Sequence, residues 1–134
     1  MTTLSLIEGI GPAYAESLKA AGITSVEALL EKGGTPAGRK EIAAASGVRE
    51  AQVLEWVNRA DLFRIRGVGP EYSDLLEEAG VDTVVELARR DPQHLYDKMV
   101  AVNAEKNLVR KLPAPSQVQS WVEQAKALPR QVHY

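Results

Sequence analysis

The chain has 134 residues, 45% of them hydrophobic and 25% charged, which is enough to bury a globular core. It lacks cysteine, which excludes disulfides, thiolate metal ligands and cysteine nucleophiles and fits a cytoplasmic protein. Sixteen basic against eighteen acidic residues give a net charge of −2, whereas dedicated nucleic-acid binders normally carry a basic excess. The longest apolar runs fall far short of the roughly 20 residues of a membrane span, so no membrane partner is expected.

The first half of the chain has helical periodicity throughout. Tyr14, Leu18 and Ala21 follow helical spacing behind Pro12, and Gly22 suits the left-handed residue that ends a helix. The pattern predicts helices at about residues 12–21, 25–32, 37–46 and 50–61. N-caps or capping boxes are expected in both halves of the chain, at Thr24, Thr35, Thr83 and Asp91.

The second half of the chain repeats the first. Residues 7–14 (IEGIGPAY) recur as residues 65–72 (IRGVGPEY), and ten of the 25 residues from Ile7 to Glu31 are identical at this offset of 58. Further along, the residues around Trp56 recur around Trp121 at an offset of 65, so the second copy carries about seven extra residues. Helices are therefore expected at about residues 70–79, 83–90, 92–103 and 116–127.

The predicted fold is all-α, with two tandem four-helix repeats at residues 1–62 and 63–128 docked into one compact unit. The joint Asp61–Ile65 has three apolar residues and no Gly, Ser or Pro, so it is expected to be packed. The extra residues of the second copy predict a basic loop near residues 103–115, where disorder is expected. Residues 129–134 are predicted to be a frayed, flexible tail.

Each repeat opens with a Gly-hydrophobic-Gly-Pro motif, at residues 9–12 and 67–70. Both glycines are expected to allow positive φ, so that Gly11→Val would strain the turn. The apolar residue between them is expected to fill the core. Backbone amides at the start of the helix that follows are then left pointing outward. They form either an anion site for phosphate or carboxylate, or a tight inter-helix turn whose amides are hydrated.

These motifs resemble the hairpins of the helix-hairpin-helix superfamily. The repeat is similar to helical domains at the start of recombinases and at the end of the RNA polymerase alpha subunit, and to a bacterial family known as a domain of unknown function with tandem hairpins. The resemblance implies sequence-nonspecific contact with a DNA backbone. The residues that it places around the phosphate are Gly9, Ile10, Gly11, Ala13 and Tyr14, with Gly67, Val68, Gly69, Glu71 and Tyr72 in the second copy.

The chain departs from the superfamily in the charges near the turns. DNA-binding members often carry Lys or Arg where this chain has Ala13 and Glu71. A carboxylate at Glu71 repels an anion, which makes the second hairpin the poorer clamp unless Arg64 and Arg66 approach it. The first hairpin lacks an incoming helix, which is expected from the helix around Trp121 or from a second subunit. The aromatic residues on the apolar stripes are expected to be core residues: Tyr14, Trp56, Tyr72 and Trp121.

Residues 98–111 are the most basic segment, with a net charge of +3. The basic residues expected to contact nucleic acid are Arg64, Arg66, Lys106, Arg110 and Lys111. The predicted function is a non-enzymatic module that touches a DNA or RNA backbone weakly, through the first hairpin and the basic loop. The alternative is an interaction module that binds another protein or a second copy of itself.

Enzymatic motifs are missing from the sequence. The histidines His94 and His133 stand far apart and fit no metal-ligand spacing. There is no phosphate-binding loop of the Walker type and no nucleophile elbow. No metal, cofactor or small-molecule substrate is therefore expected.

Overall fold

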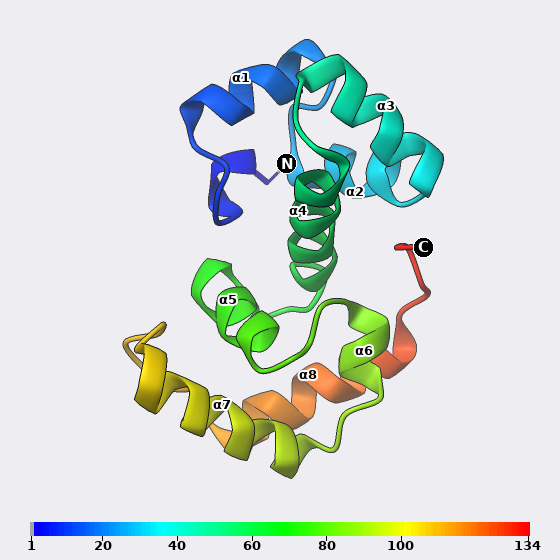
Figure 1. Ribbon diagram of the computed structural model, residues 1–134. Coiled ribbons are helices and arrows are strands. Elements are labelled where there is room, and N and C mark those ends of the chain that lie inside the picture. Colours follow the sequence, from blue (N-terminus) through cyan, green and yellow to red (C-terminus); the bar gives the residue numbers. More distant parts are fainter. Residues whose placement is uncertain (1) are drawn as a thin grey trace. The chain divides into compact units, whose positions relative to one another are not determined.

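The computed structural model describes residues 2–134, and these form eight α-helices, one short 3-10 helix and no strand (Figure 1). The elements in chain order are η1 (Leu4–Leu6), α1 (Pro12–Ala20), α2 (Val26–Gly33), α3 (Pro36–Ser46), α4 (Glu50–Leu62), α5 (Pro70–Glu78), α6 (Val84–Ala88), α7 (Pro92–Lys106) and α8 (Pro115–Ala127). The predicted all-α class is confirmed. Every predicted helix is present, and its ends lie within three residues of those expected. Only η1 was not predicted.

The chain divides into two compact units. Of the described residues, the first unit contains residues 2–61 together with Gln131–Tyr134, and the second contains Leu62–Arg130. The division falls inside the predicted joint, where Leu62 and Ile65 are buried, so the prediction of a packed joint is confirmed. Docking of the two units into one body stays a prediction.

In the first unit, α3 packs against both α1 and α2. Its core is built from apolar side chains of every helix, including Leu18, Leu29, Ile42 and Trp56, which are fully buried. α2 and α4 approach closely at Gly33, where an added Cβ would lie 2.5 Å from Val57 Cγ2. The predicted core position of Trp56 is confirmed.

In the second unit, α8 packs against both α6 and α7, and α5 packs against α7. A single cluster of buried side chains runs from Leu62 to Ala125 and includes Trp121, whose predicted core position is confirmed. Each unit therefore buries one tryptophan from its last helix. Trp56 and Trp121 are also the residues that correspond to each other at the sequence offset of 65.

Side-chain caps begin four of the helices. Oxygens of Thr35, Thr83 and Asp91 accept hydrogen bonds from backbone amides of α3, α6 and α7, as predicted. The cap of α2 differs from the prediction, because Ser25 Oγ and not Thr24 accepts the amide of Ala28 at 3.1 Å. The chain turns out of its extended conformation one residue later than the capping-box pattern suggests.

The basic loop is ordered, which corrects the prediction of disorder. α7 continues to Lys106, so part of the extra length lengthens a helix. Asn103 then holds the loop from inside the helix: its Oδ1 accepts the amides of Leu108 at 2.8 Å and Val109 at 2.9 Å, and its Nδ2 donates to the Val109 carbonyl. Val109 is buried. The Asn103 side chain and the buried Val109 therefore fix a segment whose charge had suggested a solvated loop.

The last residues also differ from the predicted frayed tail. Val132 is only 2% exposed, and the His133 amide donates to the Gly34 carbonyl at 2.7 Å. The buried guanidinium of Arg39 donates to the carbonyls of Gly33 and His133. Residues 131–134 therefore form part of the first unit, because the buried side chain of Val132 and the hydrogen bonds of the His133 amide and carbonyl hold them there.

Candidate functional site

The two Gly-hydrophobic-Gly motifs form turns with the same backbone conformation. We call residues 7–11 the Gly9 turn and residues 65–69 the Gly67 turn. Gly9 and Gly67 have φ of 92° and 97°, in the left-handed region that glycine favours. Gly11 and Gly69 have φ of −87° and −110°, which any residue adopts. The expectation of positive φ at the second glycine is wrong, because the chain has already re-entered extended backbone before the helix begins.

The middle residue of each turn is part of the core. The side chains of Ile10 and Val68 are buried, as predicted. Their backbone amides donate to the carbonyls of Ile7 and Ile65, both at 3.1 Å. These two amides close the turns internally, so the sites that the resemblance assigned to them are already occupied by protein acceptors.

A tryptophan lies directly against each turn. A Cβ at Gly9 would lie 3.4 Å from Trp56 Nε1, and a Cβ at Gly67 would lie 2.9 Å from Trp121 Nε1. In the first unit, α4 thus supplies the tryptophan that α8 supplies in the second. This corrects the prediction for the Gly9 turn, since the helix that closes it carries Trp56 and not Trp121.

The helices that follow the two turns start without a capping side chain. The N-caps of α1 and α5 are Gly11 and Gly69, and neither makes a side-chain hydrogen bond. This contrasts with the Ser, Thr and Asp caps of α2, α3, α6 and α7. Because glycine brings no oxygen to the first amides of α1 and α5, those amides are left to solvent or to a ligand.

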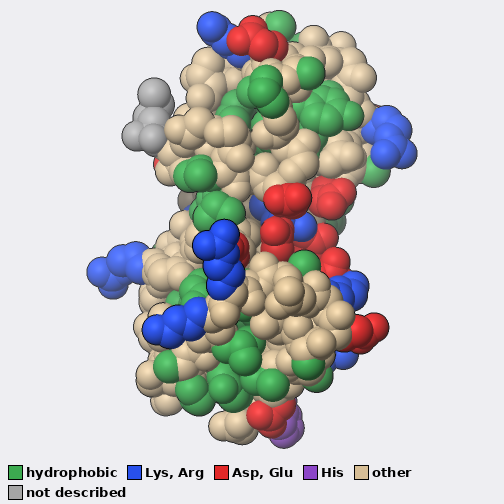
Figure 2. Space-filling view, turned by 90° about the vertical axis from the view of Figure 1, so that its left-hand side faces the viewer, with side chains coloured by type: hydrophobic (Ala, Val, Ile, Leu, Met, Phe, Trp, Pro, Cys, Tyr) green, Lys and Arg blue, Asp and Glu red, His purple; other side chains and the backbone are tan. Residues whose placement is uncertain are grey.

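The Gly67 turn borders a hollow of about 440 Å³, which the basic loop also lines. Its lining residues are Gly67, Gly69, Pro70, Glu71, Tyr72, Arg110 and Lys111. The Tyr72 hydroxyl donates to the Lys111 carbonyl at 3.0 Å and holds the loop beside α5. The prediction paired the basic loop with the first hairpin, whereas the structure places Arg110 and Lys111 beside the second. Figure 2 shows Lys and Arg side chains projecting from the second unit.

The other predicted basic residues do not line this hollow. Lys106 Nζ lies 2.6 Å from Glu78 Oε2, and the hydrogen bond and charge of that carboxylate raise the pKa of Lys106. Arg64 Nη2 donates to the Pro129 carbonyl at 2.7 Å. The backbone of Arg66 pairs with the side-chain amide of Gln124. The basic residues that line the hollow at the Gly67 turn are Arg110 and Lys111, and not Arg64 and Arg66 as the sequence suggested.

The tyrosines of the two units are exposed to different degrees. Tyr72 is partly buried and its ring centroid lies 5.2 Å from that of Trp121. Tyr14 makes the corresponding contact with Trp56 at 5.1 Å, but it is 46% exposed. The prediction that Tyr14 is a core residue is therefore wrong, because nearly half of the residue stays exposed despite its contact with Trp56.

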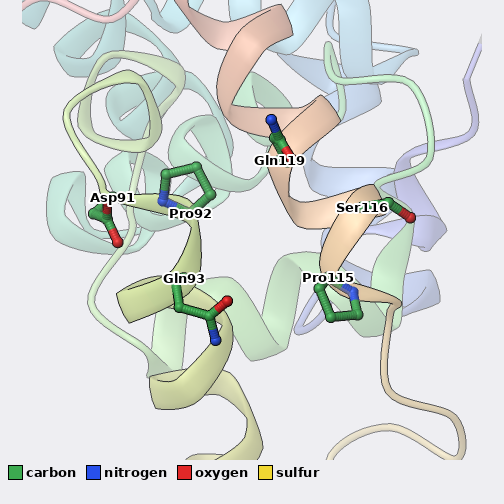
Figure 3. A pocket seen from close by; sticks show the side chains of 6 residues that line it. All are labelled: Asp91, Pro92, Gln93, Pro115, Ser116 and Gln119. Carbon is green, nitrogen blue, oxygen red and sulfur yellow. The ribbon is translucent and has the colours of Figure 1, made fainter.

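A second hollow of the second unit lies where α7 and α8 begin (Figure 3). It has a volume of about 340 Å³ and is lined by Asp91, Pro92, Gln93, Pro115, Ser116 and Gln119. Asp91 caps α7 by accepting the His94 amide at 3.0 Å, and the Gln117 side chain accepts the Ala114 amide at 2.7 Å. The acidic group of this hollow, Asp91, thus already serves as a helix cap.

Residues 2–134 contain neither a metal-binding cluster nor a helix that could span a membrane. No group of three or more His, Asp or Glu side chains in this part of the chain is arranged to hold a metal ion. Within the same residues, no helix combines the length and the apolar character needed to cross a membrane.

Comparison with known proteins identifies the family. The chain belongs to the family described as Domain of unknown function (DUF4332), whose model matches residues 8–128. This match includes the Gly67 turn, residues 8–11 of the Gly9 turn and all eight α-helices. No curated protein and no solved structure matches the chain.

Proposed function

We propose that this protein is a non-enzymatic, tandem helix-hairpin-helix module that makes weak, sequence-nonspecific contacts with a DNA or RNA phosphate backbone. The contact surface is the hollow at the Gly67 turn. Two features support this proposal: the resemblance of both turns to the hairpins of that superfamily, and the uncapped start of α5. A phosphate oxygen accepts hydrogen bonds from such amides without reference to base identity.

The observation that carries the proposal is the meeting of two positive features in one hollow. The first amides of α5 lack a capping oxygen, and the exposed side chains of Arg110 and Lys111 line the same space. The loop that brings these side chains is fixed by Tyr72 and Asn103. A phosphate seated there would therefore meet groups that are already positioned.

Glu71 limits the strength of this site. Glu71 lines the same hollow. Its negative charge is attracted to the positive N-terminal end of the α5 dipole, so it competes with a phosphate for that position. Replacing Glu71 with Gln removes this competition. We expect the Glu71→Gln variant to bind nucleic acid roughly threefold to tenfold more tightly than the parent chain.

The primary experiment is fluorescence anisotropy with labelled single-stranded DNA, double-stranded DNA and RNA at low salt, followed by a salt titration. Binding that depends on phosphate contacts must weaken as the salt concentration rises. Similar affinities for unrelated sequences are expected. Absence of binding at micromolar protein concentration would contradict the proposal and favour the protein-interaction alternative.

The site is tested by changing Arg110 and Lys111 together to Ala. The Lys111 carbonyl, and not its side chain, accepts from Tyr72, so the loop should keep its place in this variant. We expect the affinity to fall about tenfold and the salt slope to fall by about two. A matched control changes the exposed residues Arg89 and Lys98 of the same unit to Ala. Equal losses in both double variants would mean that only overall charge matters.

A further inference from the structure

Residues 131–134 belong to the first unit and are not helical, and we call them the strap. One of the four side chains, that of Val132, is buried, and the other three are exposed. The His133 amide donates to the Gly34 carbonyl, and the His133 carbonyl accepts from Arg39 Nη2, both at 2.7 Å. The first unit therefore binds one aliphatic side chain of the strap and the main chain of the residue that follows it.

The strap, and not the local backbone, explains the glycine at position 34. Gly34 has φ of −67° and ψ of −19°, which is helical backbone that any residue adopts. A Cβ at this position would overlap the carbonyl oxygen of Gln131, and its next neighbour would be the Leu30 carbonyl oxygen at 3.1 Å. The missing side chain therefore makes room for the main chain of the strap.

The strap also explains a buried cation. Arg39 is 6% exposed, and its guanidinium donates to the Gly33 carbonyl at 2.9 Å as well as to the His133 carbonyl. Arg39 is the fourth residue after the N-cap of α3, and the fourth residue after the N-cap of α7 is the buried Leu95. A guanidinium in such a position is costly unless its N–H groups find acceptors. The strap supplies one of these acceptors.

The strap is short enough to leave its place while the helices of the first unit stay folded. Its one buried side chain and its main-chain hydrogen bonds are set against the conformational entropy lost in ordering four residues. The helices have a core of their own, which includes Leu18, Ile42 and Trp56. Release of the strap uncovers an apolar position together with a free carbonyl at Gly34 and a free donor at Arg39.

We propose that the corner formed by Gly33, Gly34 and Arg39 is a binding site for a short, non-helical peptide, and that the strap is its detachable occupant. The ligand is a partner segment that places an aliphatic side chain where Val132 lies and presents the next main-chain amide and carbonyl to Gly34 and Arg39. The strap of a second copy is not the ligand, because the chain's own identical strap is tethered at an effective concentration of about 1 mM. The site does not depend on nucleic-acid binding.

The probe is a labelled peptide with the sequence of residues 130–134 (RQVHY), titrated with the full chain and its variants. Val132→Asp places a charge on the buried position and should release the strap, with the circular dichroism of the parent chain retained. We expect this variant to bind the peptide at least tenfold more tightly than the parent chain, whose tethered strap competes. A peptide that carries the same Val132→Asp change should not bind.

Substitutions in the corner test the site in the Val132→Asp background. Gly34→Ala puts a Cβ where the Gln131 carbonyl of the peptide would lie and should weaken binding at least tenfold. Arg39→Leu introduces the residue type of the second unit, removes the donor to the peptide and should weaken binding roughly fivefold to tenfold. Lys40→Ala removes a neighbouring exposed cation and is the matched control, which should leave peptide affinity unchanged.

Three results would overturn the proposal. Loss of the helical signal in the Val132→Asp variant would make the strap an integral part of the fold and not a detachable occupant. The other two are absence of saturable binding by that variant, and equal peptide affinity with and without Gly34→Ala. Nucleic-acid affinity should be the same in the Val132→Asp variant and the parent chain, so the two proposals fail separately.

Discussion

The Gly9 turn and the Gly67 turn have the same backbone conformation but different surroundings. Both have a left-handed first glycine, an uncapped helix after the second glycine, and a tryptophan beneath. Within the second unit a loop lies beside the Gly67 turn, brings two cations and accepts a hydrogen bond from its tyrosine. The corresponding connection of the first unit, between α3 and α4, is only residues 47–49. The comparison teaches that the turn itself sets where the uncapped amides of the next helix lie, whereas residues about 40 positions away set the charge beside them.

The strongest test of the shared backbone is to remove each tryptophan. Trp56→Ala and Trp121→Ala should each destabilise their own unit by about 3–5 kcal/mol, because both side chains are buried beneath a turn. Urea unfolding followed by circular dichroism measures this loss. The parallel between the units would break if either substitution cost less than about 1 kcal/mol.

The same variants also test the predicted docking of the two units. Each unit contains one tryptophan, so each variant keeps a fluorophore only in the intact unit. An unchanged urea midpoint for that fluorophore would mean that the units unfold separately. A midpoint that falls together with the circular dichroism signal is the result that docking requires.

A smaller effect is expected from adding a methyl group to one glycine of a turn. Gly67→Ala places a Cβ at φ 97° and 2.9 Å from Trp121 Nε1, which should cost roughly 1–3 kcal/mol. Gly69→Ala is the matched control, since its φ is ordinary and nothing lies within 4 Å of the new Cβ. It should change stability by less than about 1 kcal/mol. Thermal unfolding measures both, and equal costs would contradict the geometry of the turn.

The helices and caps could be predicted because their signals are local. Proline at the first helical position, glycine after the last turn and Thr35 or Asp91 at an N-cap act within four residues. The two tryptophans could be placed in the core because each stands on an apolar stripe of helical period. Local rules misplaced only details such as the cap of α2, where Ser25 and not Thr24 accepts the amide.

The candidate site could not be predicted in the same way, because it depends on contacts between distant residues. Nothing near Arg110 in the sequence indicates that Tyr72 will hold its loop. The signal that was available is Asn103, an amide side chain three residues before the end of α7 that satisfies the loop's first amides. The ordered tail has the same character, since His133 is held by Gly34 and Arg39, which lie about 100 residues earlier in the chain.

The loop itself is tested by removing single hydroxyl groups. Tyr72→Phe deletes the hydrogen bond to the Lys111 carbonyl and should cost about 0.5–1.5 kcal/mol. Hydrogen exchange at the amides of Leu108 and Val109 should become faster, because the loop loses one of the hydrogen bonds that hold it. Tyr14→Phe is the matched control and should leave stability unchanged. A stable Tyr72→Phe variant with unchanged exchange would show that Asn103 alone orders the loop.

The smallest effect concerns a carboxylate that only the first unit has. Glu27 accepts hydrogen bonds from Thr2 Oγ1 at 2.7 Å and the Thr2 amide at 2.8 Å, and these bonds lower its pKa below 4.5. Its place in the second copy is taken by Val85. The Glu27 carboxylate therefore binds a proton more readily in the unfolded chain than in the folded one. Its contribution to the free energy of unfolding is present above pH 4.5 and is lost as the pH falls through the lowered pKa of the folded state.

Because Glu27 is exposed, these hydrogen bonds contribute less than about 1 kcal/mol to stability. The effect therefore has to be measured on the unfolding of the first unit alone. The measurement is the urea midpoint of Trp56 fluorescence, in a Trp121→Phe background, between about pH 6 and about pH 3. Glu27→Gln should lower the midpoint at the upper end and flatten the pH dependence. Glu31→Gln, an exposed position on the same helix, is the control. If both variants kept the pH dependence of the parent chain, the Thr2–Glu27 hydrogen bonds would not stabilise the first unit. The loop beside the Gly67 turn would then be the difference between the two units that remains.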